Sequence, residues 1–159
     1  MAEIKNLSHF DQTGRAVMVD VSAKRESQRT ARAQAVVRMQ PTVIAALPDN
    51  PKGDPLEVAR IAGILAAKRT ADLIPMCHPL PLTHVDVQVT VLADRIRIEA
   101  TAATLAPTGV EMEALTAASL AALTVYDMTK ALDPGATITD ICLLEKTGGQ
   151  SGHYQRSAP

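Results

Sequence analysis

The chain has very few aromatic side chains: Phe10, Tyr126 and Tyr154 are the only ones, and it has no tryptophan. Hydrophobic residues nevertheless make up 47% of its 159 residues. The interior must therefore consist of aliphatic side chains and alanines, which let neighbouring backbones pack closely. Aromatic platforms for stacking bases are missing and the net charge is −1, so nothing in the composition indicates nucleic-acid binding.

Cysteine is also scarce. Cys77 and Cys142 are the only two, too few for a disulfide framework or a four-cysteine zinc site. The N-terminus has no basic segment leading into an apolar run, and no apolar stretch is long enough to cross a bilayer, so we expect no membrane contact and a cytoplasmic protein. The length fits one domain. We place it at residues 13–147, between a flexible N-terminus (1–12) and a flexible, Gly-rich tail (148–159).

Two helices are predicted from their start and stop signals. Asp54–Glu57 (DPLE) places an aspartate at the cap, a proline at the first helical position and a glutamate three residues after the cap. This helix is expected to end near Arg69. Thr108–Glu111 (TGVE) repeats the capping pattern before a second helix, which reaches about Leu132 and is stopped by Asp133–Gly135 (DPG).

Alternation of apolar and polar residues predicts most of the strands. A short apolar run before the first helix is interpreted as an additional edge strand. The order is β-α-β-β-α-β with an extra N-terminal strand, which predicts an α+β fold: a ferredoxin-like sandwich with two helices on one face of an antiparallel sheet. The strands are expected at residues 15–21, 30–39, 85–91, 96–101 and 137–145.

The second predicted helix is more apolar than a two-layer domain requires. A helix that lies on a sheet buries one apolar stripe, whereas apolar residues cover most of the circumference of this one. Another subunit, which we favour, or an unexpected element could cover the second side, or the alanines could tolerate water. The apolar residues are Met112, Leu115, Ala118, Leu120, Ala122, Leu123, Val125 and Met128.

Three prolines surround Cys77-His78 in the segment LIPMCHPLPL (73–82). Neighbouring residues of an extended segment point to opposite sides, so the pair is poorly placed to share a zinc ion. A catalytic Cys–His pair normally comes from distant segments. We therefore favour a rigid, proline-stiffened wall of a ligand pocket, with Cys77 as a small buried hydrophobe. There His78 could transfer protons or contact phosphate; alternatively, local backbone hydrogen bonds satisfy it.

Charged residues near the helix ends are further candidates. Lys52 lies two residues before the cap Asp54, where the helix dipole favours an anion. It could share a bound phosphate with the helix terminus, or it could simply be solvated. Asp127 and Lys130 are three residues apart and therefore share a helix face. They could form a surface ion pair or an acid–base pair that moves protons.

Glu113 and Asp127 lie fourteen positions apart in the second helix, which corresponds to roughly 21 Å of rise on nearly the same face. One small ligand cannot contact both within one chain, so a site that uses both must combine two protomers. The segment Lys146–Gly152 (KTGGQSG) resembles a phosphate-binding loop in composition, but no helix follows it, so it is not a Walker motif. Its backbone could wrap a ligand, or it could belong to a disordered tail.

Four segments, in order, resemble the MoaC family of molybdenum-cofactor biosynthesis, the cyclic pyranopterin monophosphate synthases. The resemblance covers nearly the whole chain. It implies a lyase that rearranges a nucleotide-derived substrate, a cyclised dihydro-GTP, to a pyranopterin with a cyclic phosphate and releases pyrophosphate. It also implies a ferredoxin-like fold and a homohexamer, a trimer of dimers with sites between subunits. The segments are MVDVSAK (18–24), KGDPLEVARIAGILAAKRTADLIPMCHPL (52–80), TGVEMEALTAASLAALTVYDMTKA (108–131) and LLEKTGGQSG (143–152).

The resemblance also implies roles for single residues. Asp127 would be the catalytic acid–base residue, with Lys130 beside it, and Lys52 would contact the nucleotide or its phosphates. No metal site and no cofactor are implied, although a divalent cation could accompany the triphosphate. The residues implied to bind substrate are Met76, Cys77, His78, Met112 and Glu113 in the pocket, and Lys24, Arg29 and Lys146 at the triphosphate.

Two departures from the family pattern stand out. Met76 occupies a position where leucine is expected, a nearly isosteric exchange. Thr147 and Gln150 occupy positions where serine and lysine are frequent, so the tail lacks one expected cation. The rival interpretation is a non-catalytic ferredoxin-like module that binds a nucleotide between subunits. Such a module would not need acid and base groups at His78, Glu113, Asp127 and Lys130.

Overall fold

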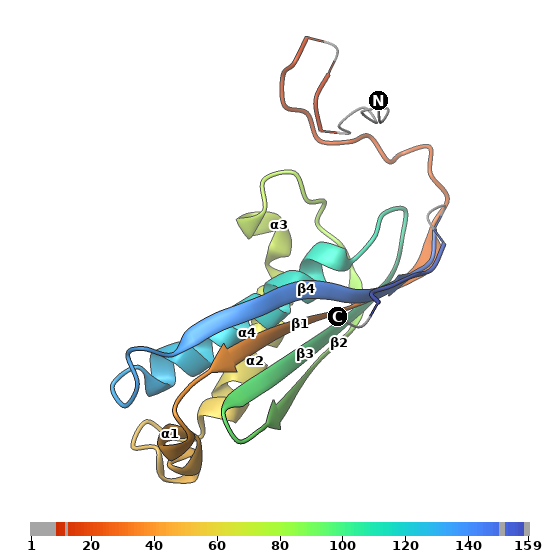
Figure 1. The fold of residues 1–159 in the computed structure, drawn as a ribbon. Coiled ribbons are helices and arrows are strands. Elements are labelled where there is room, and N and C mark those ends of the chain that lie inside the picture. The colour runs from red at the N-terminus through yellow and green to blue at the C-terminus, as the bar shows by residue number, and fades with distance from the viewer. Residues whose placement is uncertain (1–8, 12, 150–151, 158–159) are drawn as a thin grey trace.

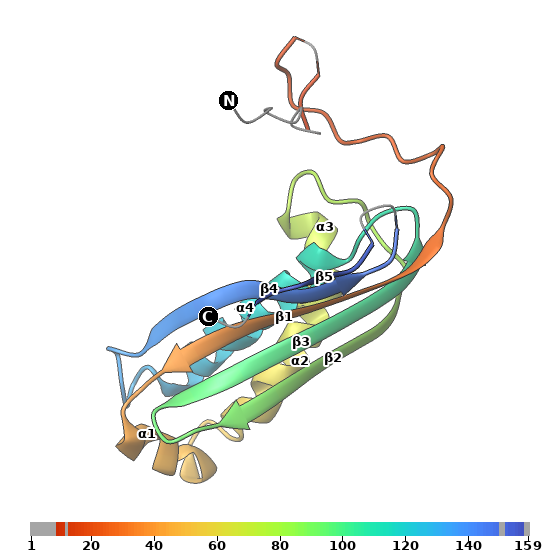
Figure 2. The same cartoon turned by 45° about the vertical axis from the view of Figure 1, so that its right-hand side comes forward.

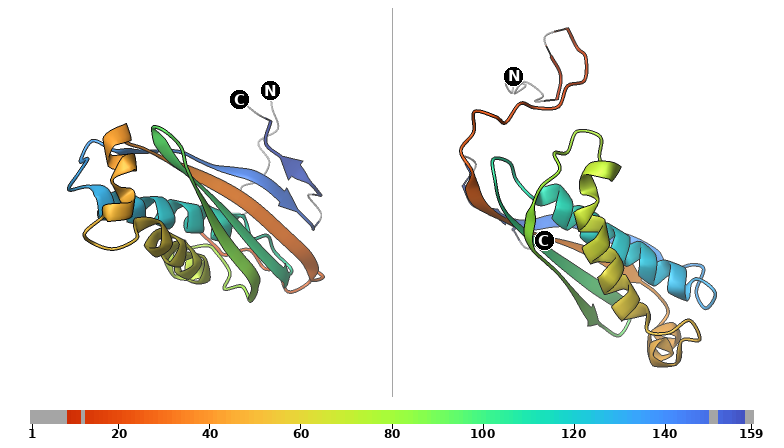
Figure 3. Two further views of the ribbon diagram at one scale, coloured as in Figure 1. Left: turned by 90° about the horizontal axis from the view of Figure 1, so that it is seen from below. Right: turned by 180° about the vertical axis from the view of Figure 1, so that it is seen from behind.

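The computed structural model describes residues 9–11, 13–149 and 152–157. In this part of the chain, a five-stranded antiparallel sheet has the order β2-β3-β1-β4-β5 (Figures 1 and 2). Helices α2 and α4 lie on one of its faces (Figure 3). The predicted α+β ferredoxin-like sandwich is confirmed. The domain boundaries and the flexibility of both ends stay predictions; residues 1–8, 12, 150–151 and 158–159 lie outside the described part.

The strands follow the predicted alternation. Central strand β1 (Ser27–Arg38) pairs with β3 (Arg95–Ala106) on one side and with β4 (Thr137–Thr147) on the other. The outer strand β2 (Leu82–Val91) completes the predicted hairpin with β3. A short strand that the sequence did not predict, β5 (Tyr154–Gln155), pairs with the end of β4 and brings the described part of the tail onto the sheet.

The two long helices differ in how they begin. Helix α2 (Pro55–Lys68) has the predicted cap, because the Asp54 carboxylate accepts hydrogen bonds from the backbone N–H groups of Leu56 and Glu57. The capping box predicted for α4 (Glu111–Thr129) is wrong: Val110 occupies the cap position and no side chain caps the helix. The Glu111 carboxylate pairs instead with Lys146 of β4, at 2.7 Å.

The predicted edge strand at residues 15–21 is also wrong. Ala16 forms a single bridge to Phe10, and the described part of this segment makes no further pairing. Both sides of β1 are already occupied, and the segment runs away from the sheet (Figures 1 and 2).

Three one-turn elements are too short for helical periodicity to reveal. They are α1 (Pro41–Ala45), the 3-10 turn η1 (Leu47–Asp49) and α3 (Thr70–Leu73).

Small residues let α2 and α4 cross in close contact. A Cβ placed on Gly63 of α2 would lie 2.9 Å from the backbone oxygen of Ala117 in α4, too close for any side chain. Ala118, Ala122 and Val125 of α4 are fully buried within the single chain. Helix α2 and the sheet therefore cover part of the apolar surface of α4 for which we favoured a second subunit, while Met112 and Leu123 stay exposed.

Some apolar surface remains exposed on the helical layer. Val58, Ile61 and Leu65, spaced three and four residues apart, form a stripe along α2, and Leu123 of α4 is 51% exposed. Unburied apolar stripes of this kind are typical of surfaces that contact another chain. No helix in the described residues is long and apolar enough to span a membrane.

Candidate active site

The residues proposed to bind substrate gather around two adjoining hollows near the N-terminal end of α4. The larger hollow, of about 370 Å³, is formed by the loop after α3, the start of α4 and the segment before β1. All of the predicted pocket residues line it. They are Met76, Cys77, His78, Met112 and Glu113; Lys24, which we predicted at the triphosphate, lines this hollow too.

The smaller hollow, of about 240 Å³, is polar and carries three cationic side chains, Lys24, Arg29 and Lys146. Lys24 and Glu111 line both hollows, so the two lie next to each other. Three cations around one small polar hollow suit a polyanion such as a triphosphate. The structure thus brings together all eight residues that the resemblance implied for substrate binding.

Arg29 and Lys146 are already held by partners. The Arg29 guanidinium donates hydrogen bonds to the backbone oxygens of Ala106 and Pro107, at 2.9 and 3.0 Å, which fixes the loop before α4. Lys146 Nζ donates to Glu111 Oε1 at 2.7 Å, and both side chains are largely buried. The charge of Lys146 is therefore partly compensated.

Glu111 is a site residue that the prediction missed. It lines both hollows and is the partner of Lys146. The sequence showed an acid at the start of an apolar helix, but its cation lies thirty-five residues away. Only the packing of α4 beneath β4 brings the two together.

Glu113 lines the larger hollow, in a less polar setting. It is 4% exposed, and burial raises the pKa of its carboxyl group, with a further increase from the neighbouring charge of Glu111. A buried carboxyl with a raised pKa holds its proton to higher pH and can donate it. Glu113 is therefore suited to be a general acid or a hydrogen-bond donor toward a ligand.

Cys77 does not have the properties of a nucleophile. Burial, and then the charge of Glu113, raise the pKa of the Cys77 thiol. The reactive species would be the thiolate, and both effects disfavour it. This agrees with our interpretation of Cys77 as part of a wall.

His78 lines the hollow and is also held by the backbone. Its Nε2 lies 2.9 Å from the backbone oxygen of Val19 in the segment before β1. A carbonyl only accepts, so Nε2 must carry the hydrogen, which leaves Nδ1 as the acceptor in the neutral ring. The backbone partner of His78 is therefore not local, as the alternative interpretation expected, but belongs to a segment 59 residues away, and it fixes a ring that lines the pocket.

A second group of predicted residues, Asp127, Lys130 and Lys52, lies at the other end of α4. Lys130 Nζ donates to Asp127 Oδ1 at 2.6 Å, and Lys52 Nζ donates to the backbone oxygen of Asp127 at 3.2 Å. The hydrogen bond and charge of Lys130 lower the pKa of Asp127, and Asp127 in turn raises the pKa of Lys130. The pair is ionised at neutral pH and exposed, with 62% of the Asp127 side chain accessible.

The structure corrects our physical explanation for Lys52. We placed it at the positive end of α2, where a cation is disfavoured. Its ammonium instead contacts the C-terminal end of α4, the negative end of that helix dipole. The position of Lys52 is therefore favourable without a bound phosphate.

The two groups do not meet within one chain. They occupy opposite ends of a 19-residue helix, and Glu113 and Asp127 are separated by roughly 21 Å of helical rise. Each group is therefore only part of a site that would use both.

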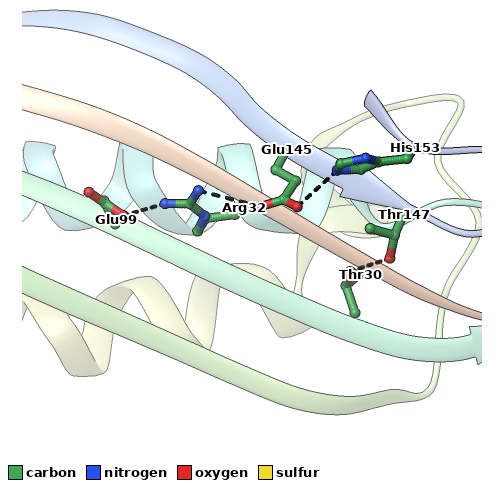
Figure 4. Close-up of polar contacts among 6 residues, drawn as sticks. All are labelled: Thr30, Arg32, Glu99, Glu145, Thr147 and His153. Carbon is green, nitrogen blue, oxygen red and sulfur yellow. Dashed lines mark hydrogen bonds and ion pairs between the residues drawn. The ribbon is translucent and has the colours of Figure 1, made fainter. Parts of the chain in front are cut away.

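Two groups of polar contacts lie on the outer face of the sheet, one of them at the smaller hollow (Figure 4). Thr30 and Thr147, which line that hollow, share a hydrogen bond of 2.6 Å between β1 and β4. Farther along, Arg32 lies between Glu99 and Glu145, and His153 contacts Glu145 (Figure 4).

Within the described residues, no three His, Cys, Asp or Glu side chains are gathered as a metal-binding set.

Comparison with known proteins shows the family of this chain. The model of the MoaC family matches residues 18–149, which include both groups. The chain belongs to the MoaC family. Three relatives named cyclic pyranopterin monophosphate synthase come from Streptomyces griseus, Rhodospirillum rubrum and a Roseiflexus species. They are 56%, 55% and 54% identical to this chain, over 96%, 98% and 95% of its length and 88%, 96% and 98% of theirs.

Membership of the MoaC family explains why the four motif segments occur in one chain. All four overlap the matched region, and all residues proposed to bind substrate or to act in catalysis fall inside it. The roles of single residues remain proposals.

Proposed function

We propose that this protein is a cyclic pyranopterin monophosphate synthase, a lyase of molybdenum-cofactor biosynthesis. It would convert cyclised dihydro-GTP to cyclic pyranopterin monophosphate and release pyrophosphate. The observation that carries the proposal is the identity of about 55% with synthases over nearly the full length of both chains. A pocket whose larger part suits a heterocycle and whose cationic part suits a triphosphate supports it. We keep the cytoplasm as the expected location.

We propose that each active site combines two protomers. The exposed group of Asp127, Lys130 and Lys52 from one chain would face the hollow at the N-terminal end of α4 in its neighbour. This accounts for the roughly 21 Å between Glu113 and Asp127 in a single chain. The exposed apolar stripe on α2 offers a surface for such a contact. The expected assembly is a homohexamer, a trimer of dimers.

In the proposed complex, cations hold the triphosphate while the ring system occupies the larger hollow. Lys24, Arg29 and Lys146 would contact the phosphates, and His78, Met76 and Met112 would contact the ring. Preorganised cations stabilise the charge that develops as a phosphate is displaced. No cofactor is proposed, and a divalent cation could enter with the triphosphate.

The proposed chemistry has two parts. Asp127, Lys130 and His78 would move protons while the purine-derived ring opens and recloses, which is worth roughly 10²–10⁴-fold in rate per acid–base group. A ribose oxygen would then attack the α-phosphorus, forming the bond that closes the cyclic phosphate. The bond from the α-phosphorus to the bridging oxygen breaks, and pyrophosphate leaves.

The direct test is to incubate the purified protein with cyclised dihydro-GTP and to measure pyrophosphate and pterin product together. We expect both, in equal amounts. A non-catalytic nucleotide-binding module would bind the compound and release neither. Binding without pyrophosphate release would therefore favour that rival and end the proposal.

A further inference from the structure

A buried asparagine connects the loop of Lys52 to the end of helix α4. Asn50 is only 9% exposed, although it lies in a loop. Its Nδ2 donates a hydrogen bond to the backbone oxygen of Met128 at 3.1 Å, and its Oδ1 accepts one from the backbone N–H of Lys52 at 2.9 Å. One side chain thus bridges two segments that are 78 residues apart in sequence.

The last turn of an α-helix leaves four backbone oxygens without helical partners. In α4, the tripeptide Asn50–Lys52 supplies partners for two of them, Asp127 and Met128. Lys130 N–H donates to Tyr126 O, and Leu132 N–H to Thr129 O, both at 2.8 Å. The loop is therefore docked on the helix end that carries Asp127.

The local turn leaves the Lys52 backbone little freedom. Pro51 has a fixed φ, and Gly53 closes the turn by donating its N–H to the Asn50 backbone oxygen at 3.0 Å. Gly53 itself has a φ of +93°, a conformation that glycine adopts readily. The long Lys52 side chain is held by one hydrogen bond to an exposed carbonyl, so its direction depends on where this backbone is placed.

From these contacts we infer that Asn50 is a positioning residue for Lys52. It sets the Lys52 ammonium beside the Asp127–Lys130 pair, and it acts on the reaction only through Lys52. The inference rests on the proposed function, because it assigns Asn50 to the same site. The alternative is that Asn50 merely stabilises the end of α4.

Asp133 provides a control for that alternative. It is also buried at the end of α4, and its carboxylate accepts hydrogen bonds from the backbone N–H groups of Gln40 and Gly135 at 2.9 and 3.0 Å. These bonds lead toward α1 and the following turn, away from Lys52. A change at Asp133 should weaken the same region without moving the Lys52 ammonium.

The test compares Asn50→Ala, Lys52→Ala, the double variant and Asp133→Asn. A misplacement of about 1 Å at a catalytic group can cost up to about 100-fold in rate, so we expect Asn50→Ala to lower kcat by about 10- to 100-fold. In the Lys52→Ala background, the same substitution should change kcat by less than about twofold, because coupled residues are not additive. Asp133→Asn should lower the melting temperature and leave kcat within about threefold of wild type.

A second measurement does not depend on turnover. The rate at which acetic anhydride acetylates Lys52, relative to Lys68 in the same molecule, reports how firmly the Lys52 ammonium is held. We expect Asn50→Ala to raise this ratio about two- to tenfold, the effect of one lost hydrogen bond. Asn50→Ser, whose hydroxyl can keep the turn but is too short to reach Met128, should behave similarly and serves if the alanine variant does not fold.

Two results would overturn the inference: equal loss of kcat in the wild-type and Lys52→Ala backgrounds, or unchanged acetylation of Lys52 in both Asn50 variants. A wild-type protein that releases no pyrophosphate would refute the proposed function instead. In that event the acetylation ratio still decides whether Asn50 positions Lys52.

Discussion

The two ends of helix α4 place their carboxyl groups in opposite environments. At the N-terminal end Glu113 is buried, and its pKa is raised by burial. At the C-terminal end Asp127 is exposed, and its pKa is lowered by Lys130. One end thus favours a carboxyl that keeps its proton, and the other a carboxylate that stays ionised. Such a contrast is typical of acid–base sites, and here it is available only if two chains bring the opposite ends together.

The C-terminal end of α4 can be tested by removing the Asp127 carboxylate, its proposed acid–base group. Asp127→Asn keeps the size of the side chain but removes the carboxylate, so we expect turnover to fall by about 10²–10⁴-fold, with assembly and substrate binding retained. Pyrophosphate release, size-exclusion chromatography and calorimetric titration measure the three properties. Asp94→Asn is the matched control, because Asp94 is also exposed and paired with a cation, Arg95. Unimpaired turnover in Asp127→Asn would defeat the assignment.

The proposed triphosphate site, near the N-terminal end of α4, can be tested at Lys24, which lines both hollows. Lys24→Ala removes one charge from the proposed triphosphate site, and we expect kcat/KM to fall by about 10²-fold. Lys68→Ala, which removes a cation from the end of α2, should have no effect. If Lys24→Ala matched wild type, the triphosphate could not lie where we place it.

The burial of Glu113 predicts how stability depends on pH. Its pKa is raised in the folded state, so the folded chain binds its proton more tightly than the unfolded chain does. Stability is therefore highest below the ordinary value of 4.5 and falls as the pH rises from there through the raised pKa. Glu113→Gln should remove this decline. Thermal unfolding between pH 4 and 8 measures it, and parallel curves for the two proteins would show that Glu113 carries no such shift.

The smallest effect is expected at Cys77. If Cys77 is part of the wall and not a nucleophile, Cys77→Ser should retain turnover within about tenfold, because only packing changes. Burial and Glu113 raise the pKa of the thiol, so its alkylation by iodoacetamide should be slow at neutral pH and accelerate in alkaline solution. Complete loss of turnover in a folded Cys77→Ser variant would restore the nucleophile as an explanation.

Much of the fold followed from local signals. The DPLE cap begins α2 where it was expected, and the alternation of valines and isoleucines predicted the β2–β3 hairpin. These signals depend on residues close together in the chain. The strand predicted at residues 15–21 failed because an apolar run does not reveal whether a sheet edge is free to pair with it.

The site was predictable as a set of residues but not as an arrangement. Sequence motifs indicated which residues line the hollows, but they did not predict the contacts between segments that are distant in the chain. Glu111 pairs with Lys146, Lys52 reaches the end of α4, and Asn50 bridges the same two segments. Packing of α4 against β4 and against the loop before α2 creates these contacts, and no periodicity in the sequence encodes them.

The most direct test of the two-chain site is to mix two inactive variants, Asp127→Asn and Lys24→Ala, after dissociation and reassembly. Asp127 lies at the C-terminal end of α4, and Lys24 lies beside the N-terminal end, so each variant removes a group from a different part of the proposed site. A mixed dimer would therefore hold one site with both defects and one site with none. With random pairing, about a quarter of wild-type activity should return in an equimolar mixture. A mixture no more active than its components, although mass spectrometry shows mixed oligomers, would contradict the account.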